Sequence, residues 1–141
     1  MTLTRRLVIT IVPALFALSA YAQTPAPKDL QIINRRIGFG EIAAPGRTIV
    51  VHYAGWLFDG AAAENKGYQF DSSRSRGQPL TLQLGVGRVI VGWDQGIPGM
   101  KVGGLRKLTI PPELAYGSRG FPPMIPASAT LVFEVELVAV R

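Results

Sequence analysis

The sequence contains no cysteine and only one histidine, His52. Without cysteine, the chain has no disulfide framework and no thiolate nucleophile, and it does not depend on the redox state of its compartment. One histidine leaves almost nothing from which to build a zinc site or a Ser-His-Asp triad. We interpret His52, which lies inside the strand-like run TIVVHYAGW, as structural, with a catalytic role as the alternative.

Other sites of catalysis and cofactor binding are also missing. Gly85-Val86-Gly87 lacks the third glycine and the Lys-Ser/Thr pair of a phosphate-binding loop, so we interpret these glycines as turn residues. Glu134 and Glu136 alternate with apolar residues and are expected on the solvent face of a strand rather than in an acid-base pair. We therefore expect no metal, nucleotide or other cofactor.

Long runs of basic residues are absent too. The basic residues are scattered, with pairs at Arg35-Arg36 and Arg106-Lys107 but none of the runs that mark nucleic-acid or polybasic membrane contacts. The composition, 48% hydrophobic and 17% charged, is that of a compact globular protein and not of a disordered polyelectrolyte. No nucleic-acid partner is expected.

The N-terminal residues 1–22 have the pattern of a secretory signal peptide. Arg5 and Arg6 precede an apolar run from Leu7 to Leu18, and Ala20-Tyr21-Ala22 has the small-x-small form of a cleavage site. We expect cleavage after Ala22 and a periplasmic mature protein, with secretion as the alternative. An uncleaved anchor is the other interpretation, but the apolar run is shorter than the ~20 residues of a spanning helix. No stable membrane insertion is expected after cleavage.

The 141 residues fit one domain. Removing residues 1–22 takes away two arginines and no acidic residue, which lowers the net charge from +6 to +4. Residues 23–28, QTPAPK, are predicted to be a short flexible linker, and residues 29–141 to be the domain. Because only a few residues separate Ala22 from Leu30, no long helical extension is expected there, and we expect a monomer.

The apolar runs predict several strands and a single helix. Ile90, Trp93 and Ile97 recur with helical spacing, so a short helix is predicted over Arg88–Ile97, ended by Pro98-Gly99. Short, β-branched runs predict strands at Leu30–Phe39, Thr48–Trp56, Pro79–Leu84, Leu105–Ile110 and Thr130–Val140. The predicted fold is α+β, with a curved antiparallel sheet and one short helix sharing the core.

Aromatic residues and two long loops are the remaining features. Asp59–Gln69 and the proline-rich Pro111–Ala129 are predicted to be loops. The aromatic residues either pack the core or converge on a concave aromatic cup, and they are Tyr53, Phe70, Trp93, Tyr116, Phe121 and Phe133.

Five segments in matching order carry a resemblance to a known family. They are VHYAGWLFDG (51–60), FDSSRSRGQPL (70–80), LGVGRVIVGWDQGIPGMKVGG (84–104), LTIPPELAYG (108–117) and IPASATLVFEVEL (125–137). Over residues 29–140 the chain resembles the FKBP-type peptidyl-prolyl cis-trans isomerases. The resemblance implies a half-barrel of antiparallel strands wrapped around one short helix, and an enzyme that accelerates X-Pro amide rotation.

The resemblance also implies the site. Its catalytic residues would be Asp71, Ile90 through its backbone N–H, Trp93 as the pocket floor, and Tyr116 through its hydroxyl. Its substrate-binding residues would be Tyr53, Phe70, Leu80, Val89, Phe121, Met124, Ile125 and Phe133. Leu80, Phe121 and Met124 depart from the family pattern and leave substrate preference and inhibitor affinity open. The implied ligands are proline-containing segments of exported proteins, and macrolides such as tacrolimus and rapamycin.

Two other functions stay open. A module of the same fold can hold proline-containing segments as a chaperone with little turnover, and a third interpretation is a small-molecule binding protein. Joint retention of Asp71, Trp93 and Tyr116 favours the enzyme.

Overall fold

The computed structural model of the protein describes residues 8–13 and 23–141. The predicted signal peptide therefore lies largely outside the described residues, and its described part, 8–13, has no regular secondary structure. Within the described ranges, no helix is long and apolar enough to cross a membrane.

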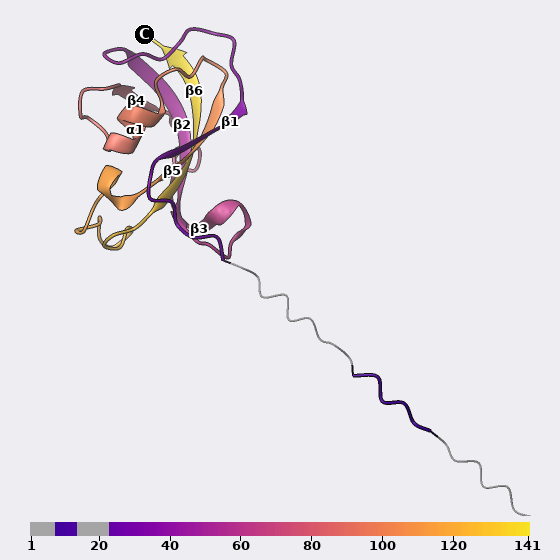
Figure 1. Ribbon diagram of the computed structural model, residues 1–141. Coiled ribbons are helices and arrows are strands. Elements are labelled where there is room, and N and C mark those ends of the chain that lie inside the picture. The colour runs from indigo at the N-terminus through magenta and orange to yellow at the C-terminus, as the bar shows by residue number, and fades with distance from the viewer. Residues whose placement is uncertain (1–7, 14–22) are drawn as a thin grey trace, which may run out of the picture.

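The domain is one antiparallel sheet with a short helix against one face (Figure 1). Along the sheet the strand order is β1-β5-β6-β2-β3, and β4 pairs with β2. The strands are β1 (Gln31–Arg36), β2 (Thr48–Phe58), β3 (Lys66–Ser72), β4 (Leu80–Gln83), β5 (Leu105–Ile110) and β6 (Leu131–Val140). The helix α1 spans Val91–Gly96, and two 3-10 turns, η1 (Ala63–Asn65) and η2 (Pro112–Leu114), lie in the loops.

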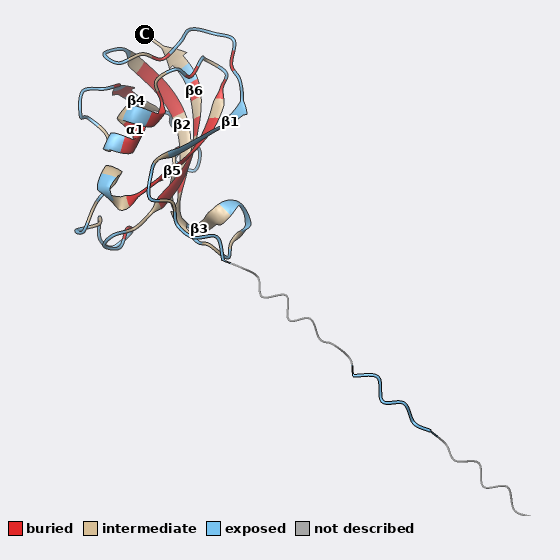
Figure 2. Ribbon diagram, viewed as in Figure 1, coloured by how far each residue is buried: buried red, intermediate tan, exposed pale blue. Residues whose placement is uncertain are grey.

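The core lies between α1 and the central strands, where the buried residues gather (Figure 2). Alternate residues of a strand face opposite sides of the sheet, and the apolar set of β2, β5 and β6 faces the helix. Two helix glycines permit a close approach. A Cβ at Gly92 would lie 2.5 Å from Ile110 Cγ2, and one at Gly96 would lie 2.9 Å from Leu108 Cδ2. The helix therefore packs directly on β5.

The α+β prediction is confirmed, but the helix is shorter than the predicted Arg88–Ile97. Gly85 and Gly87 have positive φ angles of 81° and 74°, and Ile90 is extended with φ −57° and ψ 147°. The backbone therefore cannot be helical before Val91. This extended segment becomes one side of the pocket described below.

The prediction of a loop over Asp59–Gln69 is wrong at its C-terminal end. Strand β3 begins at Lys66 and pairs with β2, and the 3-10 turn η1 precedes it. β3 ends the strand order, so its side chains are only partly buried and its sequence KGYQFDS carries little of the apolar alternation of a half-buried strand. The predicted linker is also tied to this region, because Thr24 N–H donates to the Gly60 carbonyl at 3.0 Å.

Candidate functional site

A pocket of about 190 Å³ opens between α1 and the sheet. Its walls come from β2, β3, β4, β6, the segment before α1 and the loop after η2. The lining residues are Tyr53, Phe70, Asp71, Leu80, Arg88, Val89, Ile90, Trp93, Tyr116 and Phe133. Residues far apart in the sequence thus meet in one concave, mainly apolar site.

The base of the pocket is a set of aromatic rings in edge-to-face contact. Trp93, at 4% exposure, lies 5.0 Å from the Tyr53 ring and 5.4 Å from the Phe133 ring, with interplanar angles of 79° and 83°. Phe70 meets Phe133 at 5.6 Å and 88°. Such pairs favour this geometry because the positive edge of one ring meets the negative face of the other. The rings therefore fix one another and form a rigid apolar base.

Gly55 makes room for these rings. A Cβ at this position of β2 would lie 2.7 Å from both Phe133 Cε1 and Phe70 Cζ. Real Cβ atoms essentially never come so close to another atom. The two phenylalanine rings can therefore pack across β2 only because residue 55 has no side chain.

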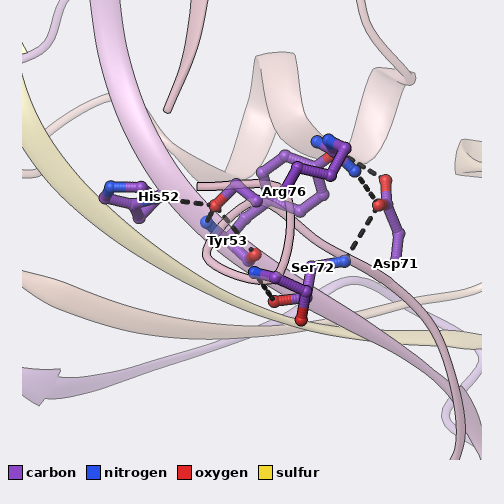
Figure 3. Close-up of polar contacts among 7 residues, drawn as sticks. His52, Tyr53, Asp71, Ser72 and Arg76 are labelled. Carbon is purple, nitrogen blue, oxygen red and sulfur yellow. Dashed lines mark hydrogen bonds and ion pairs between the residues drawn. The ribbon is translucent and has the colours of Figure 1, made fainter. Parts of the chain in front are cut away.

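One group of polar side chains borders the aromatic base (Figure 3). The Tyr53 hydroxyl donates to Asp71 Oδ2 at 2.5 Å. Arg76 forms an ion pair with Asp71 Oδ1 and donates from Nη2 to the Tyr53 hydroxyl oxygen at 2.9 Å. The Ser72 backbone N–H also donates to Asp71 Oδ1, at 2.9 Å. Both oxygens of the Asp71 carboxylate are thus bonded within the protein.

The two tyrosines of the pocket are held in their neutral form. Burial raises the pKa of Tyr53, and its hydrogen bond to Asp71 raises it further, while the hydrogen bond from Arg76 lowers it. Burial also raises the pKa of Tyr116, with a smaller contribution from the charge of Asp71. Both hydroxyls therefore stay protonated to higher pH than an ordinary tyrosine, and the Tyr53 proton is donated to Asp71.

His52 lies outside this pocket and supports it from the other side of β2. Its Nδ1 is 2.9 Å from Ser73 Oγ, which accepts the Tyr53 backbone N–H at 2.7 Å (His52 and Tyr53 are labelled in Figure 3). Ser73 is fully buried and bonds the backbone on which Tyr53 stands. This arrangement agrees with the structural interpretation of the histidine.

The segment before α1 forms one lip of the pocket. Asp94 of the helix accepts the backbone N–H of Gly85 at 2.8 Å through Oδ1 and that of Gly87 at 2.9 Å through Oδ2. These two bonds and the positive φ angles agree with the interpretation of the glycines as turn residues. After this turn, Val89 and Ile90 line the pocket.

Nine of the twelve site residues predicted from the sequence line the pocket, and three do not. Phe121 and Met124 are 61% and 40% exposed, and the Phe121 ring lies 5.6 Å from the Tyr116 ring, outside the pocket lining. Ile125 is 3% exposed and packs in the core. Its backbone forms a reciprocal pair of hydrogen bonds with Phe121, which places its side chain inward.

Two arginines of the site were missed by the sequence analysis. Arg76 bonds both Asp71 and Tyr53, and Arg88 lines the pocket mouth. The sequence carries a signal for Arg88, which directly precedes the predicted pocket residue Val89.

Residues 59–69, which form a loop and the beginning of β3, contribute no residue to the pocket and are bonded to the opposite face of the sheet. Lys66 Nζ bridges Glu64 Oε2 at 2.8 Å and Glu134 Oε1 at 2.6 Å, and it lies 4.5 Å from the centre of the Trp56 ring. Lys107 Nζ donates to the Glu64 carbonyl at 2.6 Å. The loop therefore covers the outer side of the central strands.

Among the described residues, no group of three or more His, Cys, Asp or Glu side chains could hold a metal ion. The polar side-chain groups of the pocket lining are one carboxylate, two tyrosine hydroxyls, the Arg88 guanidinium and the indole N–H of Trp93, while Arg76 bonds Asp71 and Tyr53 from outside the lining. Such a site suits the non-covalent binding of a largely apolar ring with polar groups on either side.

Comparison with known proteins identifies the family of this site. The family of FKBP-type peptidyl-prolyl cis-trans isomerases matches residues 40–138. A "FK506-binding protein" of Neisseria meningitidis serogroup A is 57% identical over 112 residues, which are 79% of this chain and 96% of the relative. "Peptidyl-prolyl cis-trans isomerase FPR2" of Saccharomyces cerevisiae is 58% identical over 99 residues, covering 70% of this chain and 69% of the relative.

Solved structures agree with this likeness. The crystal structure of AtFKBP13 has a TM-score of 0.70 and 42% identity, over 82% of this chain and 96% of the other. That of FkpA from Escherichia coli has a TM-score of 0.67 and 44% identity, over 79% of this chain and 48% of the other. The chain therefore belongs to the family of FKBP-type peptidyl-prolyl cis-trans isomerases, and the prediction of an isomerase with an FKBP fold is confirmed.

Proposed function

We propose that the protein accelerates X-Pro isomerisation in exported proteins as they fold in the periplasm. The observation that carries the proposal is the aromatic pocket built around Trp93, together with the N-terminal pattern of a signal peptide. Secretion beyond the periplasm is the alternative destination. X-Pro rotation takes tens to hundreds of seconds without a catalyst and often limits folding, so such an activity has a use wherever chains fold.

The reaction needs no acid, base or nucleophile from the protein, because no covalent bond breaks. Rotation about the amide loses resonance and meets a barrier of about 18–20 kcal/mol. A catalyst needs only to bind the twisted amide better than the planar one. The twisted amide has less charge separation than the planar form, so an apolar pocket favours it.

The pocket residues take distinct parts in this scheme. The Trp93 ring supports the substrate proline from below, and Tyr53, Phe70 and Phe133 enclose it. The Ile90 N–H and the Tyr116 hydroxyl donate to substrate carbonyls on either side, and the raised pKa of Tyr116 keeps that hydroxyl protonated. The proline ring is thereby held while the preceding amide turns.

Asp71 acts through its position. Its two oxygens are already bonded to Tyr53, Arg76 and the Ser72 N–H, so its part in the scheme is to hold neighbouring groups in place. It holds the Tyr53 ring against Trp93 and places a negative field beside the rotating carbonyl. Asp71 is thus a positioning residue of the pocket.

Macrolides of the tacrolimus and rapamycin type are proposed to occupy the same pocket. Several relatives carry the name "FK506-binding protein", and the proposal is based on these names. Leu80 in the lining, and Phe121 and Met124 outside it, are expected to set the affinity. Such a ligand would compete with X-Pro peptides.

Holding of unfolded chains is a second function that one observation favours. Phe121 and Met124 are exposed apolar residues on the loop beside Tyr116, and exposed apolar surface of this kind attracts unfolded segments. The double variant F121S/M124S is expected to lose suppression of aggregation while retaining peptide isomerisation.

The proposal is tested in two steps. Osmotic shock of cells that express the full chain should release a protein whose mass corresponds to residues 23–141. This mature protein should then accelerate the proline-limited refolding of an exported protein, and tacrolimus should block the acceleration. Retention of the full-length chain in the cytoplasm contradicts the proposed location, and refolding at the uncatalysed rate contradicts the proposed role.

A further inference from the structure

Arg88 is a charged residue at the mouth of an otherwise largely apolar pocket. It lines the pocket beside Val89 and Ile90, and it is exposed to solvent. Its backbone follows the turn that Asp94 fastens through Gly85 and Gly87. The backbone of Arg88 is therefore held in place at the lip of the pocket, while its side chain is exposed to solvent.

The acidic groups near the pocket are already engaged by other partners. Asp71 is paired with Arg76, and Asp94 uses one oxygen for each of its two backbone bonds. Among the residues that the structure describes, Arg88 takes part in no ion pair or side-chain hydrogen bond. Several other basic residues do form ion pairs, and they are Arg35, Arg36, Arg47, Lys66, Arg74 and Arg76. In the part of the chain that the structure describes, Arg88 thus has no ion-pair or hydrogen-bond partner of its own at the side of the pocket that it lines.

We propose that Arg88 is a specificity-determining residue, which favours X-Pro segments with a carboxylate side chain next to the proline. The inference rests on the binding of X-Pro segments in this pocket, as argued above. The base of the pocket takes the proline ring, so the residues immediately before and after it must pass the lip. A carboxylate there meets a guanidinium with five donors and no internal partner among the described residues.

The size of the preference follows from the exposure of Arg88. Exposed ion pairs change equilibria only modestly, by about 1.4- to 5-fold, and they weaken as salt rises. The preference is therefore expected to show in kcat/KM at low ionic strength and to shrink at about 0.5 M salt. A lysine next to proline should be disfavoured to a similar extent.

The test uses the mature protein and blocked peptides that contain one X-Pro bond. Two series of peptides are compared, each with Glu, Gln or Lys at one varied position. This position directly precedes the proline in one series and directly follows it in the other. Rates of cis-trans exchange are measured by NMR exchange spectroscopy, which needs no protease. In one of the two series, the expected Glu-to-Gln ratio of kcat/KM is about 1.4 to 5 at low salt. The ratio should fall to about 1 in Arg88→Gln and below 1 in Arg88→Glu.

Arg35→Gln is the matched control, because it removes the same charge from β1 and from an ion pair with Glu64 away from the pocket. It should keep the wild-type Glu-to-Gln ratio. A wild-type ratio of 1 in both series, or a ratio that Arg88→Gln leaves unchanged, overturns the inference. If no peptide is isomerised by folded wild-type protein, the activity itself fails, which is a different result from isomerisation without preference.

Discussion

The two faces of the central strands use opposite chemistry, although the same strands supply both. On the helix side, Phe133 and Tyr53 meet Trp93 through ring contacts. On the outer side, Glu134 follows Phe133 in the sequence and pairs with Lys66 at 2.6 Å. Neighbouring residues of one strand therefore belong to an apolar pocket and to a network of charges.

The difference shows that the binding pocket and the ion pairs that hold residues 59–69 in place lie on opposite faces of the sheet. The outer face ties the 59–69 loop down with ion pairs that tolerate water, and no residue of that loop reaches the pocket. The inner face is mainly apolar, and its Tyr53 and Asp71 side chains are bonded to each other and to Arg76, so it can prefer a twisted amide. We expect changes on the inner face to alter catalysis and changes on the outer face to alter mainly stability.

The largest effect is expected from Gly55→Ala. The new methyl group would overlap the Phe70 and Phe133 rings, so one or both rings must move out of the pocket wall. We expect kcat/KM to fall about ten-fold or more, and the free energy of unfolding to fall by about 1–3 kcal/mol. Peptide exchange rates and urea unfolding measure the two effects.

Ala54→Ser is the matched control, because residue 54 faces the other side of the same strand. It should retain the wild-type rate. If Gly55→Ala is as active as wild type, the packing of the two rings does not define the pocket.

Asp71→Asn should have the next largest effect on catalysis. The amide keeps the size of the side chain but removes the charge that pairs with Arg76 and accepts from Tyr53. Hydrogen bonds to charged groups contribute about 1.5–3 kcal/mol, so a loss of about ten-fold or more in kcat is expected. Since Asp71 is a positioning residue, Tyr53→Phe should lower kcat too. The fold-loss of kcat in the double variant should be smaller than the product of the two single-variant fold-losses. Independent, multiplicative losses would show that Asp71 does not act through Tyr53.

On the outer face, Lys66→Met should lower stability and spare catalysis. The variant keeps the apolar stem over Trp56 but leaves Glu134 without its partner. The expected loss in the free energy of unfolding is about 1 kcal/mol, with kcat/KM within about two-fold of wild type. A large loss of activity in the folded variant would mean that the two faces are coupled.

The smallest effect is a shift in tyrosine ionisation. Asp71 raises the pKa of both Tyr53 and Tyr116, so Asp71→Asn should lower both. A raised pKa in the folded state means that the contribution to stability is complete below the ordinary tyrosine pKa of 10.0 and is lost as the pH rises through the folded value. Ultraviolet titration of wild type, Asp71→Asn and the single Tyr→Phe variants measures the shift. Unchanged ionisation in Asp71→Asn would contradict the electrostatic part of the account.

Much of the fold was predictable because apolar periodicity reports which face is buried. β5 has the bounds predicted for it, and β2 and β6 differ by one or two residues at their ends. β3 was missed because a polar strand at the end of the sheet carries little of that signal. The helix was predicted too long, because its spacing of apolar residues continues through the extended Ile90.

The family resemblance supplied all twelve site positions, of which nine line the pocket, and three-dimensional packing decides where the other three lie. Ile125 lies in the core, and its backbone forms hydrogen bonds with Phe121. The local sequence pattern does not predict this contact. Arg76 reaches Asp71 and Tyr53 across the turn that follows β3, which also depends on the folded chain. The covering role of the 59–69 loop rests on Lys107 and Glu134, both far from it in the sequence.

The central claim is that the aromatic base, with Trp93 at its floor, catalyses X-Pro rotation without covalent chemistry. The most direct test is the rate of cis-trans exchange in an X-Pro peptide, with mature wild-type protein and with Trp93→Leu, both shown to be folded by circular dichroism. We expect clear acceleration by wild type and loss of most of it in the variant. Folded wild-type protein that leaves the rate unchanged, or a variant as active as wild type, would contradict it.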